Sequence, residues 1–93
     1  MTGTREYPTP GRFVAEFHRA DGRPIEPMIG DTVTGEFRTL VHFRPDALGL
    51  SHGERAHLTN RIVDRWNRTG VDSLPNLWSH EHKCFVFDDG EPA

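Results

Sequence analysis

Three residues in the last fifth of the chain have the chemical types and the spacing of metal ligands: His80, His82 and Cys84. On an extended strand, alternate side chains point to the same face and lie about 6.6–6.8 Å apart. Imidazole nitrogen and thiolate sulfur are ligands that zinc prefers, and a fourth ligand could come from His57, His52 or an aspartate. One interpretation is therefore a zinc site, and the other is two surface histidines beside a small buried cysteine.

A second cluster, called the arginine flank below, combines cations at helical spacing: Arg61, Arg65, Arg68 and His57. Intervals of four and seven residues place side chains on one side of a helix. Guanidinium groups bind carboxylates and phosphates in a planar, two-pronged geometry that lysine cannot reproduce. The flank is therefore a candidate surface for an acidic partner. The alternative is a solvated helix face that neighbouring acidic residues neutralise.

Trp78 is a further candidate for partner binding, because tryptophan and arginine dominate the energetics of protein interfaces. The alternative is that Trp78 fills the core beneath a loop. Enzymatic motifs are missing from the sequence, which contains neither a G-x-S-x-G nucleophile elbow nor a glycine-rich phosphate loop. We therefore expect no catalytic residues, and no cofactor apart from the zinc considered above.

Composition narrows the choice of partner and compartment. The 93 residues carry a formal net charge of −3 at pH 7, whereas a general nucleic-acid binder is clearly basic. A protein partner is therefore expected in preference to nucleic acid. The single cysteine fits a reducing compartment, and no apolar run approaches the ~20 residues that span a bilayer. These observations predict a cytoplasmic protein without membrane association.

The strands that would support these sites are expected in the first half of the chain. Residues 12–19 alternate between apolar and polar side chains, as a half-buried strand does, and Asp21 and Gly22 predict a tight hairpin turn. Residues 23–29 contain two prolines and are interpreted as a short edge strand or an extended loop. Residues 32–44 alternate again and predict a longer strand. If that strand lies at a sheet edge, it could pair two copies into a homodimer.

The clearest local signals belong to a helix over residues 51–69. Ser51 is a favourable N-cap, and Glu54 is placed to complete a capping box. Gly70 stands where a left-handed C-cap is expected. Between these signals, one apolar stripe follows the helical period: Leu58, Ile62, Val63 and Trp66.

Together these elements predict one α+β domain over residues 12–88. Residues 1–11 are expected to form a flexible arm and residues 89–93 a flexible acidic tail. A loop follows the helix, and residues 81–88 form the last strand. The order strand, strand, strand, helix, strand, with the second strand doubtful, predicts a small antiparallel sheet of three to four strands packed on one amphipathic helix.

The sequence thus favours a small non-enzymatic interaction protein that binds a macromolecular partner stoichiometrically. Inhibitors, antitoxin-like proteins and adaptors work in this way. The expected contact surface is the arginine flank, and the expected partner is a protein with an acidic surface. The alternative function is that of a zinc-binding domain. A third possibility is a small enzyme whose active site carries no recognisable sequence motif.

Overall fold

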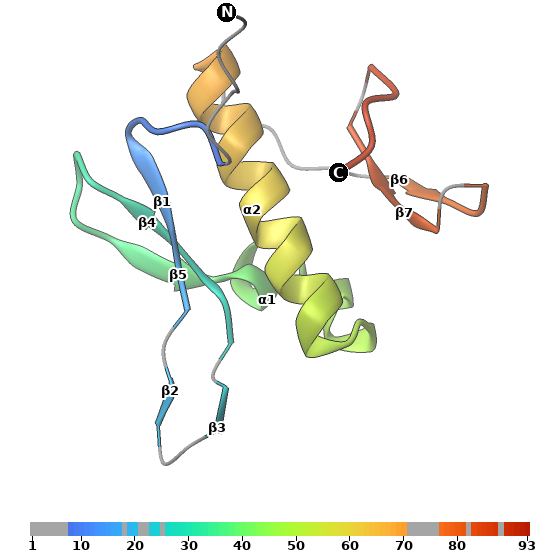
Figure 1. Ribbon diagram of the computed structural model, residues 1–93, viewed down its shortest axis with the longest axis horizontal. Helices are drawn as coiled ribbons and strands as arrows, with labels where there is room; N and C mark the ends of the chain where they lie inside the picture. The colour runs from blue at the N-terminus through green and yellow to red at the C-terminus, as the bar shows by residue number, and fades with distance from the viewer. Residues whose placement is uncertain are drawn as a thin grey trace, which may run out of the picture.

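The computed structural model describes residues 8–17, 19–20, 23–24, 26–70, 77–81, 83–87 and 89–93. It confirms the α+β class, because a three-stranded antiparallel sheet packs against one long helix (Figure 1). The strands are β1 (Phe13–Glu16), β4 (Met28–Asp31) and β5 (Phe37–Thr39), in the order β1-β4-β5. The helix is α2 (His52–Thr69). Within the described residues, no helix is long and apolar enough to cross a membrane.

The central strand, β4, comes from the end of the segment that was predicted as an edge strand or loop. The positions of the two prolines in that segment explain how β4 can be the central strand. Pro24 and Pro27 both precede β4, so each of its four residues keeps an amide donor for pairing. The register sets Phe13 opposite Asp31, and Gly30 opposite Phe37.

The prediction of one strand over residues 32–44 is wrong, and a turn explains why. Asp31 Oδ1 accepts hydrogen bonds from the amides of Val33, at 2.9 Å, and Thr34, at 3.4 Å. Gly35 adopts a left-handed φ of 77°, which costs glycine little. These local bonds compete with strand pairing, so the chain turns back before β5.

The remainder of that predicted strand is helical. After β5 the chain forms α1 (Leu40–Phe43) and then the 3₁₀ helix η1 (Pro45–Gly49). Leu40 and Ala47 are fully buried, so these turns fill the core instead of extending the sheet. Alternating apolar residues over so short a segment suit either geometry, and the packing of Leu40 decides between them.

Helix α2 begins and ends where the sequence predicts. Ser51 Oγ accepts a hydrogen bond from the amide of Glu54 at 3.2 Å, and the Glu54 carboxylate accepts one from the Ser51 amide at 3.1 Å. Gly70 forms the C-cap with a φ of 72°. The two caps satisfy backbone groups that would otherwise lack partners at the helix ends.

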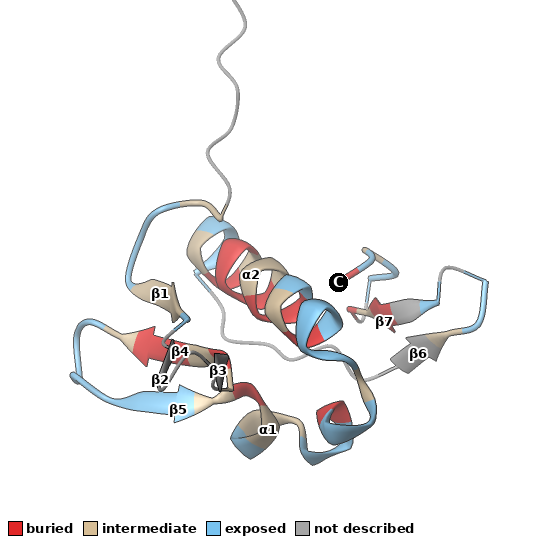
Figure 2. Cartoon of the chain, turned by 60° about the horizontal axis from the view of Figure 1, so that its bottom comes forward, coloured by how far each residue is buried: buried red, intermediate tan, exposed pale blue. Residues whose placement is uncertain are grey.

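The core lies between α2, the sheet, α1 and the end of the chain, where Phe85, Phe87 and Ala93 are buried. Figure 2 shows the buried residues along one side of α2. Trp66 joins these elements. Its ring makes edge-to-face contacts with Phe13, at a centroid distance of 4.8 Å, and with Phe43, at 5.8 Å. The predicted helix stripe is therefore the face that packs inward, and all four of its residues are buried.

Two hairpins complete the chain. The first joins β2 (Arg19–Ala20) to β3 (Arg23–Pro24), as the predicted hairpin required, although the turn residues themselves lie outside the described residues. The second joins β6 (Leu77–Ser79) to β7 (Cys84–Val86). The last strand is thus shorter than predicted, and β6 occupies part of the expected loop. In Figures 1 and 2, α2 lies between the sheet and this second hairpin.

Replacing Trp66 with alanine should lower the free energy of unfolding by about 3–5 kcal/mol, because it opens a cavity where three elements meet. Urea denaturation monitored by circular dichroism measures the change. Leu48→Ala is the matched control, since Leu48 is 67% exposed and should hardly alter the midpoint. Equal effects of the two substitutions would contradict the central role of Trp66.

Candidate functional site

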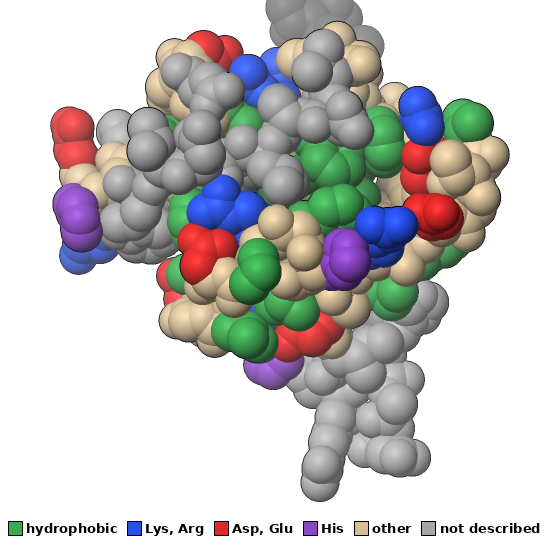
Figure 3. Space-filling view, turned by 180° about the vertical axis from the view of Figure 1, so that it is seen from behind, with side chains coloured by type: hydrophobic (Ala, Val, Ile, Leu, Met, Phe, Trp, Pro, Cys, Tyr) green, Lys and Arg blue, Asp and Glu red, His purple; other side chains and the backbone are tan. Residues whose placement is uncertain are grey.

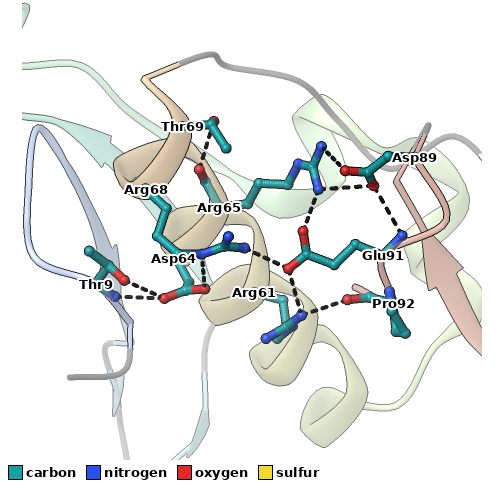
Figure 4. Close-up of polar contacts among 9 residues, drawn as sticks. All are labelled: Thr9, Arg61, Asp64, Arg65, Arg68, Thr69, Asp89, Glu91 and Pro92. Atoms are coloured by element: carbon teal, nitrogen blue, oxygen red, sulfur yellow. Dashed lines mark hydrogen bonds and ion pairs between the residues drawn. The ribbon is translucent and has the colours of Figure 1, made fainter. Parts of the chain in front are cut away.

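The arginine flank does not face open solvent in the structure. It faces residues 89–93, called the acidic segment below (Figure 4). The Glu91 carboxylate accepts hydrogen bonds from Arg61 Nη2 at 3.3 Å, from Arg68 Nη2 at 2.6 Å and from Arg65 Nη1. Three guanidinium groups from one helix thus converge on a single carboxylate. The flexibility expected of residues 89–93 stays a prediction.

Backbone hydrogen bonds hold the acidic segment beside β7. The Gly90 amide donates to the Phe87 carbonyl at 2.8 Å, and the Phe87 amide donates to the Glu91 carbonyl at 2.9 Å. The Ala93 amide donates to the Phe85 carbonyl at 2.7 Å, and Ala93 is buried. Local charge alone suggests a solvated tail, whereas these bonds turn it back towards the helix.

Arg65 is the central member of the flank, and its side chain is only 13% exposed. Its guanidinium lies over the ring of Phe87, 4.3 Å from the ring centroid. The same group donates two hydrogen bonds to the Asp89 carboxylate, at 3.1 and 3.2 Å. Cation–π contact and two-pronged pairing both orient the guanidinium, so Arg65 is held from two sides.

Asp64 anchors the other end of the flank. It is fully buried, and it accepts hydrogen bonds from the amide of Thr9 at 2.9 Å, from Thr9 Oγ1 at 2.6 Å and from Arg68 Nε at 3.0 Å. The hydrogen bond to Asp64 raises the pKa of Arg68 above its ordinary value. Because Thr9 is bound here, the part of the predicted arm next to β1 is tied to α2.

Asn67 was not singled out by its sequence context, yet it joins α2 to the edge of β1. Its Oδ1 accepts a hydrogen bond from the Phe13 amide at 2.9 Å, and its Nδ2 donates to the Phe13 carbonyl at 2.8 Å and to the Thr9 carbonyl at 2.7 Å. The side-chain amide thus takes the place of a neighbouring strand. A single asparagine in a helix carries no local signal of such a contact.

Elsewhere on the described surface, cations also stand beside acids. Figure 3 shows basic side chains adjoining acidic ones on the face seen from behind. Arg44 pairs with Asp46 at 2.7 Å, and Arg38 pairs with Glu36 at 3.0 Å. The arginine flank differs from these pairs because three cations converge on one acceptor.

The other predicted partner-binding residues lie apart from this convergence. His57 is exposed on α2 and lines a pocket of about 200 Å³ together with Leu58, Lys83 and Phe85. Trp78 lies in β6, where its backbone is paired with that of Phe85, and not in a loop. The side chain of Trp78 lies outside the described residues.

The predicted metal ligands do not share one extended strand. His80 is exposed in the turn after β6, and Cys84 begins β7 opposite Ser79. His82 and the side chain of Cys84 lie outside the described residues. Within the described part of the chain, no group of three histidine, cysteine, aspartate or glutamate residues could hold a metal ion. The strand geometry behind the zinc hypothesis is therefore replaced by a hairpin turn, and zinc binding itself stays a prediction.

Comparison with known proteins returns no match for this chain, whether with family models, curated proteins or solved structures.

The Arg65 guanidinium holds the pKa of the Asp89 carboxyl below its ordinary value through its hydrogen bonds. A lowered folded-state pKa stabilises the fold above the unfolded pKa, and this contribution is lost as the pH falls through the lowered value. Arg65→Gln should therefore raise the pKa of Asp89 towards the ordinary value of an aspartate side chain. Carboxyl-carbon NMR titration measures it.

Asp31 provides the internal control for this titration. The hydrogen bond from Arg12 lowers the pKa of Asp31 to about 2, and Arg65 takes no part in that pair. The Asp31 titration should be the same in both proteins. An unchanged Asp89 midpoint in the variant would show that Arg65 does not hold the acidic segment.

The zinc hypothesis can be tested on protein purified without a histidine tag. Bound zinc at one equivalent, lost on changing Cys84 to serine, would support it. Absence of zinc by elemental analysis, after purification without chelators, would rule it out.

Proposed function

We propose that this chain is a small non-enzymatic protein that binds an acidic segment of a protein partner through the arginine flank. In the free protein, its own acidic segment occupies the flank. The observation that carries the proposal is the convergence of Arg61, Arg65 and Arg68 on the Glu91 carboxylate. A carboxylate from a partner can satisfy the same donors.

The acidic side chains are suited to be exchanged, while backbone hydrogen bonds keep the segment beside β7. Asp89 is 60% exposed, so water solvates its carboxylate when it separates from Arg65. An ion pair with one exposed partner contributes less net stability than a buried pair of similar geometry. A partner that supplies two or more carboxylates would therefore meet a small opposing free energy from these contacts.

The flank itself would persist after such an exchange. Arg61, Arg65 and Arg68 project from one long helix, and buried Asp64 keeps its hydrogen bond to Arg68 without help from the acidic segment. Three guanidinium groups and one carboxylate then leave two net positive charges. This surplus would attract an acidic protein surface and speed encounter with it.

Stoichiometric binding without turnover is how inhibitors, antitoxin-like proteins and adaptors act, and we place this protein in that class. The net charge of −3 supports a protein partner over nucleic acid, since the phosphate backbone would be repelled by most of the surface. The single cysteine supports a reducing, cytoplasmic location.

The chain supplies a probe for this proposal, a labelled peptide with the sequence of residues 87–93. Asp89→Asn combined with Glu91→Gln weakens the internal competitor, which acts at an effective concentration in the millimolar range. We expect the double variant to bind the peptide roughly tenfold more tightly than the unchanged protein does. Fluorescence anisotropy at low ionic strength measures both affinities.

Two controls make the result specific. Asp46→Asn with Glu81→Gln removes the same number of charges away from the flank and should leave binding at the original level. Adding Arg61→Glu and Arg65→Gln to the first double variant should abolish binding while the helical circular dichroism persists. A folded Asp89/Glu91 variant that binds no peptide would refute the proposal.

A further inference from the structure

Strand β5 forms one edge of the sheet. The Asp31 amide donates to the Glu36 carbonyl at 2.8 Å, and the Leu40 amide donates to the Pro27 carbonyl at 2.9 Å. In an antiparallel ladder, alternate residues bond to the same neighbour. Phe37 therefore directs its amide and carbonyl groups away from β4. No described strand lies beyond β5, which is at the margin of the sheet in Figures 1 and 2.

The opposite edge of the sheet, β1, is occupied at Phe13. There the side-chain amide of Asn67 bonds to both backbone groups of Phe13 in β1. No described side chain makes an equivalent hydrogen bond to the backbone of Phe37. An exposed edge strand can pair with a strand of another chain. At Phe37 the β5 edge is open to such a strand, whereas at Phe13 the β1 edge is covered by Asn67.

Phe37 adds an apolar surface beside the β5 edge. Its ring covers Gly30, where a Cβ atom would come within 2.3 Å of it, and yet the residue remains 46% exposed. Phe37 lies on the sheet face opposite α2. The register shows this, because Val14, Gly30 and Phe37 share one row while the adjacent Phe13 packs on Trp66.

We infer that β5 pairs antiparallel with β5 of a second copy of this chain, with Phe37 opposite Phe37. The two Phe37 residues exchange their amide–carbonyl hydrogen bonds, and their rings meet on the open face. In this register Glu36 of each copy lies opposite Arg38 of the other. These are the closely spaced positions of the ladder, where opposite charges attract across strands.

Charge selects this register over its neighbour. A shift that sets Phe37 opposite Thr39 would bring Arg38 against Arg38, and like charges directly opposite are destabilising. Within each copy, Arg38 Nη2 and Glu36 Oε2 lie 3.0 Å apart, and both side chains are exposed. Two copies would therefore close into a square of alternating charges. Because β5 has only three residues, this dimer is weak and concentration-dependent.

Charge reversal tests this inference independently of the arginine flank. Glu36→Arg sets two arginines opposite each other across the dimer, and Arg38→Glu sets two glutamates opposite each other. Each single variant should therefore self-associate roughly tenfold more weakly than the unchanged protein. A mixture of the two variants pairs opposite charges across the interface and should form a mixed dimer. Sedimentation velocity over a range of micromolar to millimolar concentrations measures the association.

Three results would overturn the inference. They are a monomeric unchanged protein at the highest concentration, single variants that associate as the unchanged protein does, and a mixture that associates no better than its components. The exchanged variant, which combines Glu36→Arg with Arg38→Glu, should regain self-association. Glu81→Arg, an exposed change in the β6–β7 turn, is the matched control and should leave association unaltered. Thermal melting confirms that each variant is folded.

Discussion

The packing of Trp66 in the core determines how the other elements are placed around α2. Its ring joins α2 to β1 through Phe13 and to α1 through Phe43. Once this side chain points inward, the rotation of α2 about its axis is set, because successive residues of a helix project at intervals of about 100°. Asn67 then reaches the edge of β1, Asp64 reaches Thr9, and the arginine flank turns towards the β6–β7 hairpin.

Charged contacts help to hold the second hairpin and the acidic segment against α2. Residues of the hairpin and of the acidic segment contact α2 through arginine, with Arg65 over the ring of Phe87 and Glu91 among three guanidinium groups. Such contacts fix the orientation of the side chains. Where they are exposed, they add little to the free energy of unfolding, because water competes for both partners. Apolar burial adds to these polar contacts, because Phe85, Phe87 and Ala93 belong to the same buried core as the apolar stripe of α2.

Local rules predicted the elements whose signals lie close together in the chain. The capping box of Ser51 and Glu54 and the C-cap at Gly70 depend on residues within one helical turn, and both were confirmed. The strand predicted over residues 32–44 failed for the complementary reason. Period-two alternation there is compatible with a turn, which local hydrogen bonds to Asp31 stabilise, and with helix α1, which the burial of Leu40 selects.

Residue types and their spacing were enough to predict the α+β class, the bounds of α2 and the side of that helix on which its arginines stand. These properties follow from helical period and cap chemistry, which act over a few residues. The carboxylate that these arginines contact depends on long-range folding. Arg61, Arg65 and Arg68 find Glu91 across separations of 23–30 residues, through backbone turns near Gly90 that no charge pattern encodes. The physical reason is that a guanidinium can pair with any carboxylate, and the folded backbone selects which one it reaches.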